Sequence, residues 1–302
     1  MQKFIKIALF LIVILVLLSV IERITRPNVE YLEKSQDITG LINAMYHRNL
    51  GVRNDAKEAL IRIGTPAVNP LILHLEDENA CISCVVKILG EIGDNRAIEP
   101  ISKILYDEDI TNRSFAAKAL TNFGEAGVAP LIEAVKVTKQ MGYLNEALVT
   151  IGEPSVEPVS KLLKHQENFV KDSAIWILQE INDPSSEKAV VAALEDEYLV
   201  FRASKMIVSF HNEDTMVLLP YLKKKSTVGV YKALIFYGEP ATIAPLLQAI
   251  ADYGDEEMAE YYLNCGNEEL ESAATAWAKE NGYTILKYTT PLGEGAKWGG
   301  EK

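Results

Sequence analysis

Cysteine is scarce in this sequence, with three among 302 residues, so the chain cannot be a small disulfide-stabilised scaffold. Glycine and proline together number 30, too few for a collagen-like or low-complexity chain. Apolar residues make up 48% and charged residues 24%, the balance of a folded globular protein, which excludes a mostly disordered one. The length suits one large domain or two small ones.

The usual catalytic and metal-binding motifs are also missing. There is no G-x-S-x-G, no glycine-rich phosphate loop, and no G-x-G-x-x-G at a strand–helix junction. The four histidines (His47, His74, His165 and His211) lack the spacing of a metal-binding pair, and glutamate follows none of them. We therefore predict no catalytic residue, no cofactor and no metal site.

Cys81 and Cys84 form a C-x-x-C on a predicted helix, which is only half of a zinc site. We interpret them as small buried hydrophobic residues. If the body of the protein is exported, the two could instead be oxidised, and Cys265 would still be unpaired.

Charge is distributed unevenly along the chain. The net charge is −12, and because residues 1–26 carry +3, the remainder carries −15. A body this acidic repels phosphate backbones, so we expect no nucleic-acid partner. The acidic run over residues 252–271 does not have the spacing of a calcium loop and is interpreted as a solvated helix face.

One long apolar run lies near the N-terminus. Residues 7–21 carry no charge, and residues 4–21 would form a helix of about 27 Å, close to the thickness of a bilayer core. A cleaved signal peptide and a buried core helix are the alternatives. The short basic flank predicts a single-pass protein of the cytoplasmic membrane, with the N-terminus inside and the body outside. The residues expected to contact the membrane are Phe4, Ile7, Leu11, Leu15, Leu18 and Ile21.

A repeat of about thirty residues follows. We call the residue that ends each repeat's first helix the turn marker. Five markers are glycines, mostly 28 to 31 residues apart: Gly64, Gly93, Gly124, Gly152 and Gly238. Asn182 and His211 stand at the two intervening positions, and asparagine tolerates the left-handed conformation that helix ends need. Leucine or isoleucine lies four residues before each marker, in an apolar stripe of helical spacing.

A second helix follows each marker, and a proline recurs two residues after a β-branched residue, at Pro70, Pro100, Pro130, Pro158 and Pro245. Because proline is tolerated in a first helical turn, we expect it to mark the helix start. A single helical hairpin cannot bury both of its faces, whereas stacked hairpins bury a continuous core.

The pattern A-x-x-A-L-x-x-I-G-x-x-A-V-x-P-L-I, seen over residues 56–72, resembles the HEAT repeat of the phycobilisome-lyase type. The resemblance covers about residues 38–253 and implies an all-α, right-handed solenoid of about seven two-helix repeats. We expect an anchor over residues 1–26, a linker and half-repeat cap over 27–51, the array over 52–253, and a helical cap with a glycine-rich tail over 254–302.

This organisation favours a membrane-anchored, non-catalytic scaffold for protein–protein interaction. The alternative is the enzymatic function that the resemblance implies, a bilin lyase or isomerase, which would need a chromophore pocket and a phycobilisome partner. DNA glycosylases built on similar repeats form a third class, which the acidic charge disfavours.

In right-handed HEAT solenoids the second helices line the concave side. The residue three positions after each proline position points away from the apolar stripe, and we call this set the second-helix column. It reads Leu73, Lys103, Glu133, Lys161, Ala192, Tyr221 and Gln248. We predict that a protein or peptide binds along this column, with Lys103, Glu133, Lys161, Tyr221 and Gln248 as its site residues. An inert surface is the alternative.

Overall fold

The computed structural model describes Ile14 and residues 26–139, 142–196, 198–211, 214–222, 228–290 and 293–298. The chain divides into two compact units, one reaching Leu131 and the other beginning at Ile132, and each is described by itself. The division falls inside a helix and coincides with none of the boundaries expected from the sequence, which stay predictions.

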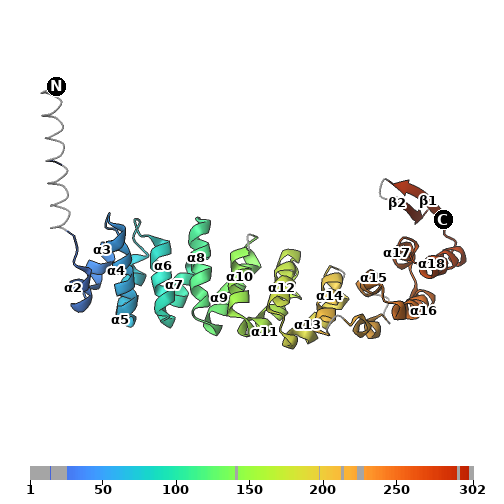
Figure 1. Cartoon of the computed structure of the whole chain (residues 1–302), viewed down its shortest axis with the longest axis horizontal. Helices are drawn as coiled ribbons and strands as arrows, with labels where there is room; N and C mark the ends of the chain where they lie inside the picture. The colour runs from blue at the N-terminus through green and yellow to red at the C-terminus, as the bar shows by residue number, and fades with distance from the viewer. Residues whose placement is uncertain are drawn as a thin grey trace, which may run out of the picture. The chain divides into compact units, whose positions relative to one another are not determined.

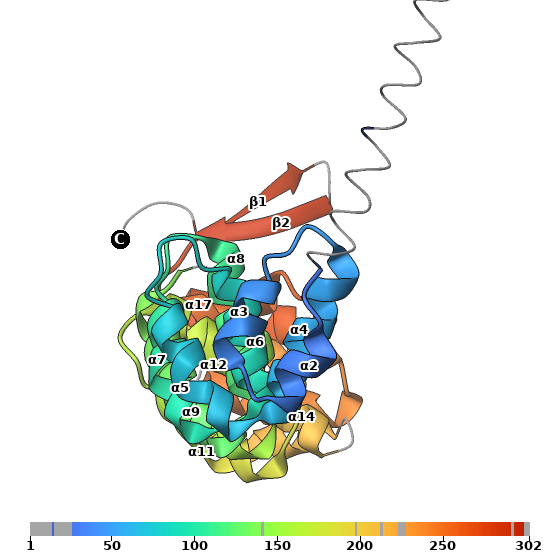
Figure 2. The same ribbon diagram turned by 90° about the vertical axis from the view of Figure 1, so that its left-hand side faces the viewer.

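The first unit is built from successive helices (Figure 1). In chain order they are α2 (Val29–Lys34), α3 (Ile38–Ala44), α4 (Leu50–Ile63), α5 (Thr65–His74), α6 (Ile82–Ile92), η1 (Asn95–Ala97), α7 (Ile98–Ile104) and α8 (Ile110–Thr121), with α9 (Glu125–Val137) crossing into the next unit. The first helices of three repeats, α4, α6 and α8, lie side by side, and the shorter α5 and α7 pack against one side of them (Figure 2).

The second unit continues the same alternation. Its helices are α10 (Gly142–Ile151), α11 (Glu153–Leu162), α12 (Asn168–Ile181), η2 (Pro184–Ser186), α13 (Glu187–Ala192), η3 (Ala193–Glu195), α14 (Val200–Phe210), η4 (Thr215–Tyr221), α15 (Val228–Tyr237), η5 (Pro240–Thr242), α16 (Ile243–Tyr253), α17 (Glu256–Leu263) and α18 (Glu268–Glu280). The helical repeat architecture expected from the sequence is thereby confirmed, and it is consistent with an α-solenoid.

The C-terminal segment departs from the all-α prediction. Strands β1 (Ile285–Thr290) and β2 (Gly293–Trp298) form an antiparallel two-stranded sheet, with Ile285 opposite Trp298 and Thr290 opposite Gly293. The sequence predicted a helical cap with a glycine-rich tail over residues 254–302. Backbone pairing with β1 is what orders residues 293–298.

The turn markers behave as predicted at six of the seven positions. All five marker glycines have positive φ, between 56° and 79°, and Asn182 adopts a left-handed conformation with φ of 51°. His211 is the exception, with φ of −107°. Its ring contacts Glu187 instead, with Nε2 2.7 Å from the carboxylate. Glycine has no Cβ and asparagine has a short polar side chain that can bond locally, and these two residues tolerate the left-handed region better than histidine does.

The prolines were wrongly expected to mark helix starts in several repeats. Pro70, Pro130 and Pro158 lie inside α5, α9 and α11. The second helix begins directly after the turn marker there, since Gly64 ends α4 and also precedes the first residue of α5. Pro100 and Pro245 do lie in a first turn, because a short 3₁₀ helix precedes α7 and α16.

The core follows the predicted stripe. The residues four positions before the markers are all almost fully buried: Leu60, Leu89, Leu120, Leu148, Leu178, Ile207 and Leu234. Small residues let neighbouring first helices approach closely, because a Cβ added to Gly90 on α6 would lie 2.7 Å from the Cβ of Ala119 on α8. Close approach of this kind gives the dense packing that buried leucines need.

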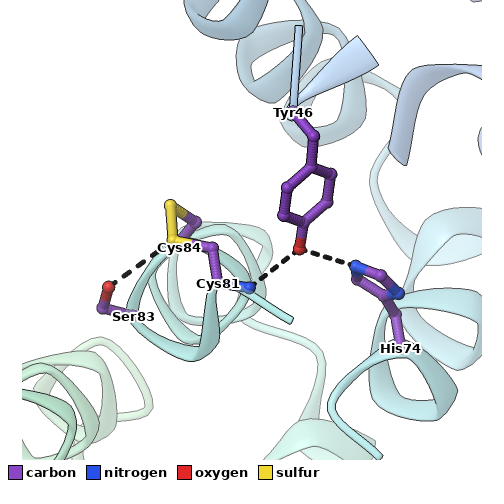
Figure 3. The surroundings of a disulfide bond; sticks show 5 residues. All are labelled: Tyr46, His74, Cys81, Ser83 and Cys84. Carbon is purple, nitrogen blue, oxygen red and sulfur yellow. Dashed lines mark hydrogen bonds between the residues drawn. A yellow bond between two sulfur atoms is a disulfide. The ribbon is translucent and has the colours of Figure 1, made fainter. Parts of the chain in front are cut away.

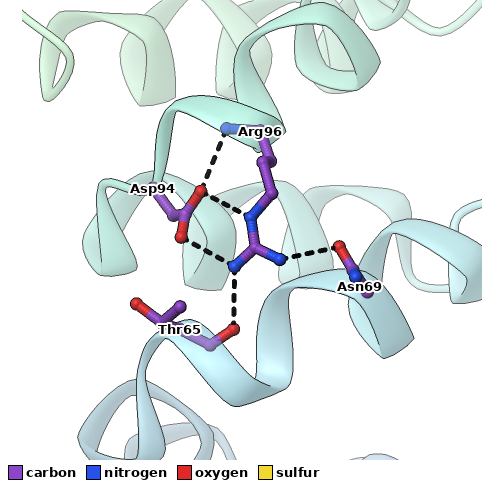
Figure 4. A network of polar contacts seen from close by, with 4 residues as sticks. All are labelled: Thr65, Asn69, Asp94 and Arg96. Atoms are coloured by element: carbon purple, nitrogen blue, oxygen red, sulfur yellow. Dashed lines mark hydrogen bonds and ion pairs between the residues drawn. The ribbon is translucent and has the colours of Figure 1, made fainter.

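A polar network joins α5 to the turn after α6 (Figure 4). The Arg96 guanidinium donates to both oxygens of Asp94, at 2.9 and 2.8 Å, and also to Asn69 Oδ1 and the Thr65 carbonyl, each at 3.2 Å. Asp94 accepts a further bond from the Arg96 backbone N–H at 3.0 Å. The side-chain and backbone hydrogen bonds from Arg96 lower the pKa of Asp94 to about 2.

The expected membrane anchor is not supported. Among the described residues, no helix has both the length and the apolar character needed to cross a membrane. As far as the described residues reach, this finding contradicts the predicted single-pass location, and neither the location nor its orientation is carried further. The residues named for the span lie outside the described residues: Phe4, Ile7, Leu11, Leu15, Leu18 and Ile21.

Leu120→Ala should lower the free energy of unfolding by about 2–5 kcal/mol, because the deleted methyl groups leave a cavity between packed helices. Chemical denaturation measures the change. Lys118→Ala, at an exposed position of the same helix, should change it by less than about 0.5 kcal/mol. An equally small loss for Leu120→Ala would show that the repeat register is wrong.

Asp94→Asn should lower the thermal midpoint near neutral pH while keeping a side chain able to cap η1. Because the folded-state pKa of Asp94 is depressed to about 2, the carboxylate stabilises the fold above its unfolded pKa of about 3.9. That contribution is lost as the pH falls from about 4 to about 2. Melting curves should therefore converge over this range, and a pH-independent difference would contradict the assigned network.

Candidate binding groove on α10, α12 and α14

Three first helices of the second unit, α10, α12 and α14, enclose a hollow of about 640 Å³. We call it the groove. It is open to solvent, and its volume lies in the range of small-molecule sites. The lining residues are Gly142, Asn145, Glu146, Asp172, Ser173, Ile175, Trp176, Gln179, Phe201, Arg202 and Lys205.

Aromatic side chains form one part of the groove. Trp176 on α12 is 40% exposed and Phe201 on α14 is 45% exposed. Phe201 also packs edge-to-face against Phe236 of α15, with ring centroids 6.0 Å apart, and Phe236 is exposed as well. Trp176 and Phe201 thus expose aromatic ring surface in the groove, on which a conjugated ligand can stack.

A charged cluster forms another part of the groove. Asp172 on α12 pairs with Arg202 on α14 and accepts a hydrogen bond from the Tyr198 hydroxyl at 2.5 Å. The same hydrogen bond raises the pKa of the Tyr198 phenol. The Arg202 guanidinium lies 5.9 Å from the centre of the Tyr198 ring, within cation–π distance, and Lys205 follows one turn later on α14.

The loop that leads into α14 is fixed by a second ion pair. Lys171 Nζ lies 2.5 Å from Asp196 Oδ2, and both side chains are largely shielded from solvent. Burial raises the pKa of Asp196, but the hydrogen bond from Lys171 opposes this, and the net pKa is lowered. Asp196 also accepts the backbone N–H of Tyr198 at 2.9 Å, which places Tyr198 beside Asp172.

One polar atom of the groove is buried without a partner. Asn145 Nδ2 donates to Ser173 Oγ at 3.2 Å, whereas Asn145 Oδ1 finds no hydrogen-bond partner among the described residues. A buried acceptor left unsatisfied costs free energy, and a ligand N–H would satisfy it. The groove therefore combines aromatic side chains, two cationic groups and one buried oxygen, Asn145 Oδ1, that has no hydrogen-bond partner among the described residues.

Each residue of the predicted partner site lies on a helix surface outside the groove. Lys103 on α7 and Lys161 on α11 form ion pairs one turn back, with Glu99 at 3.1 Å and Glu157 at 2.7 Å. Glu133 on α9 pairs with Lys136 at 2.7 Å.

The other two members of this predicted site lie in the second unit, as Glu133 and Lys161 do. Gln248 on α16 donates to Asp252 at 2.8 Å, and Tyr221 is the last residue of η4. The structure leaves the partner prediction untested.

Sequence reasoning missed the groove, although one signal was present. The residue six positions before each marker is charged in six repeats: Glu58, Lys87, Lys118, Glu146, Lys205 and Lys232. In the remaining repeat it is Trp176. An aromatic residue outside the apolar stripe, at a position that is otherwise charged, indicates an exposed surface with a use of its own.

Across the described residues, no group of three or more potential ligands could hold a metal ion. The cysteines differ from the preferred interpretation, because Cys81 and Cys84 form a disulfide, with Cα atoms 5.2 Å apart, rather than two buried thiols. Cys265 is a half-buried free thiol whose pKa burial raises.

Comparison with known proteins gives one similarity in sequence, while no family model matches the chain. The bilin biosynthesis protein PecF of Nostoc sp. strain PCC 7120 is 24% identical over 174 residues, which cover 57% of this chain and 93% of PecF. Together with the repeat, this similarity supports a HEAT-like repeat protein.

Solved structures give weaker similarities. The complex of CpcE and CpcF of phycocyanin lyase from Nostoc sp. PCC 7120 aligns with a TM-score of 0.32 and 17% identity, over 71% of this chain and 94% of that one. Human deoxyhypusine hydroxylase aligns with the same score and identity, over 84% and 100%. Scores this low support no conclusion about function.

The similarity to PecF corrects the functional prediction. A non-catalytic scaffold was the preferred interpretation, and a bilin lyase or isomerase the alternative. A relative named for bilin biosynthesis, matched over nearly its whole length, favours the alternative and contradicts the expectation that the chain is not an enzyme.

Proposed function

We propose that the chain is a bilin lyase-type enzyme and that its groove holds the bilin for transfer to an acceptor protein. The observation that carries the proposal is the composition of the groove, in which Trp176 and Phe201 expose ring surface beside the cations of Arg202 and Lys205. The similarity to PecF supports the same ligand class.

The groove suits the chemistry of a bilin in three respects. A bilin is an open chain of four pyrrole-derived rings, and its conjugated faces can stack on Trp176 and Phe201. Its two propionate groups are carboxylates, which Arg202 and Lys205 can bind. Its ring nitrogens donate hydrogen bonds, and the groove contains a buried acceptor, Asn145 Oδ1, that has no partner among the described residues.

The pair formed by Asp172 and Arg202 orients the cation before the ligand arrives. The guanidinium has five N–H donors, so a propionate can bind Arg202 while Asp172 still holds it. Tyr198 adds a donor to the same carboxylate at 2.5 Å. These residues bind and position the bilin, and the open groove leaves one edge of it accessible to an acceptor thiol.

A lyase of this type needs an acceptor protein, and in this proposal the acceptor contacts the second-helix column. Lys103 and Lys161 are strongly exposed, with side chains 73% and 71% accessible, and their ion pairs are with residues of their own helices. Exposed pairs of this kind contribute little to stability and are easily exchanged for intermolecular ones.

Arg202→Gln combined with Lys205→Gln should weaken bilin binding by about tenfold or more, because charge-assisted hydrogen bonds to the propionates are lost. Titration of the purified chain with biliverdin, followed by the absorbance change of the pigment and the quenching of tryptophan fluorescence, measures the affinity. Trp176→Leu should weaken binding as well, through lost stacking.

Lys118→Gln is the matched control, since Lys118 stands at the same repeat position on α8 but outside the groove. It should bind biliverdin like the parent chain. If the parent chain leaves the absorbance of biliverdin unchanged, or if all variants bind equally well, the groove is not a bilin site.

Affinity purification with the parent chain first isolates its acceptor protein. The triple variant Lys103→Glu, Lys161→Glu and Tyr221→Ala should bind this acceptor more weakly, because the charge and the contact area of the second-helix column both change. Isothermal titration with the acceptor gives the affinity, and a circular dichroism melt checks the fold. Lys118→Glu combined with Lys279→Glu, at two exposed positions outside the column, makes the same change of −4 in net charge and serves as its control. Unchanged affinity in a folded triple variant would exclude the second-helix column.

A further inference from the structure

A disulfide occupies the start of helix α6 in the first unit (Figure 3). Cys81 is the N-cap residue and Cys84 lies in the first helical turn, and both side chains are half-buried, so solvent reaches them. Ser83, between the two cysteines, places its hydroxyl 3.7 Å from Cys81 Sγ.

Helix α6 is one of several described helices whose N-cap makes no side-chain hydrogen bond, and its N-cap residue is a cysteine. Asp or Asn at the N-cap accepts a first-turn N–H in α2, α3, α4, α8, α17 and α18, through Asn28, Asp37, Asn49, Asp109, Asp255 and Asn267. Cys81 makes no such side-chain hydrogen bond. The disulfide of Cys81 and Cys84 lies at the first turn of α6 in place of a capping oxygen. On reduction, the N–H groups of that turn and the helix dipole favour a thiolate.

A chain of hydrogen bonds fixes this turn from outside. The Cys81 backbone N–H donates to the Tyr46 hydroxyl at 2.8 Å, and that hydroxyl lies 2.7 Å from His74 Nε2. His74 Nδ1 is 2.5 Å from Asp77. If Tyr46 donates to Nε2 and Nδ1–H donates to Asp77, every polar group of this network is satisfied. The cap stays in place whether the sulfurs are bonded or not.

One sulfur also has a place for a ligand. Cys84 lines a hollow of about 350 Å³ between α4 and α6, together with two cations, Lys57 and Lys87, and two carboxylates, Glu58 and Glu91. The two lysines can pair with carboxylates of a small zwitterionic ligand, and the two glutamates can pair with its ammonium group.

From this geometry we infer that Cys81 and Cys84 form a thiol–disulfide exchange site for a small zwitterionic thiol. A thiolate of that class attacks Cys84 Sγ, a mixed disulfide forms, and Cys81 leaves as the thiolate. A second thiolate attacks the small-molecule sulfur of the mixed disulfide. This step releases the small molecule as its disulfide and converts the protein to its dithiol form. Two electrons pass from two thiols to the protein disulfide, and the steps reverse with the oxidised small molecule.

The full-length protein equilibrated in glutathione buffers tests this inference. The fraction of oxidised pair, read by alkylation and mass spectrometry, should change continuously with the ratio of reduced to oxidised glutathione. Cys81→Ser, which places a favourable N-cap residue at the helix start, should form a mixed disulfide at Cys84. That reaction should be about tenfold faster than the one at Cys265, whose thiol pKa burial raises.

The hollow is tested separately with Lys57→Gln combined with Lys87→Gln. This variant should slow the reaction of Cys84 with oxidised glutathione but not with neutral hydroxyethyl disulfide, and Lys118→Gln should slow neither. Equal slowing with both probes would remove the hollow from the proposal. A pair that stays oxidised at every glutathione ratio, or a Cys84 no faster than Cys265, would make this a purely structural disulfide. The site lies in the unit that does not carry the groove, so either proposal can fail alone.

Discussion

Burial of one leucine or isoleucine per repeat, four residues before the turn marker, is the constraint on which both units depend. Each of these side chains is at most 1% exposed, and no single hairpin could shield it. The helix must then end within one turn so that the chain can reverse. Glycine or asparagine with positive φ provides this ending, and the hairpins stack because their stripes have no other cover.

Much of this was predictable because it depends on local spacing. The buried column, the turn glycines and the left-handed Asn182 follow from periodicity and from the conformations that each residue tolerates. His211 shows the limit of that reasoning, since it stands at the same repeat position as Asn182 and yet has a negative φ. Pro70 shows a second limit, because a proline compatible with a first turn is also accommodated farther inside a short helix.

The groove was less accessible to sequence reasoning because its members come from three helices that are about thirty residues apart. Asp172 and Arg202 meet only when α12 and α14 lie side by side, and no motif joins them. The sequence indicated the exposure of Trp176 only because the other six repeats have a charged residue at the same position, six residues before the turn marker. The disulfide between Cys81 and Cys84 likewise depends on the cap geometry of α6, which a C-x-x-C spacing alone does not specify. A functional interpretation without these contacts favoured a scaffold.

The position six residues before the turn marker has a broader consequence. Its members line separate hollows between neighbouring first helices: Glu58 and Lys87 between α4 and α6, Lys87 and Lys118 between α6 and α8, and Glu146, Trp176 and Lys205 along the groove. None of these side chains belongs to the buried column. A single codon change at this position can therefore alter the chemistry of the hollows that the residue lines, one for Trp176 and two for Lys87, while the hydrophobic core keeps its sequence. Binding chemistry on such a chain can thus vary from one pair of first helices to the next while the packing of the repeats stays the same.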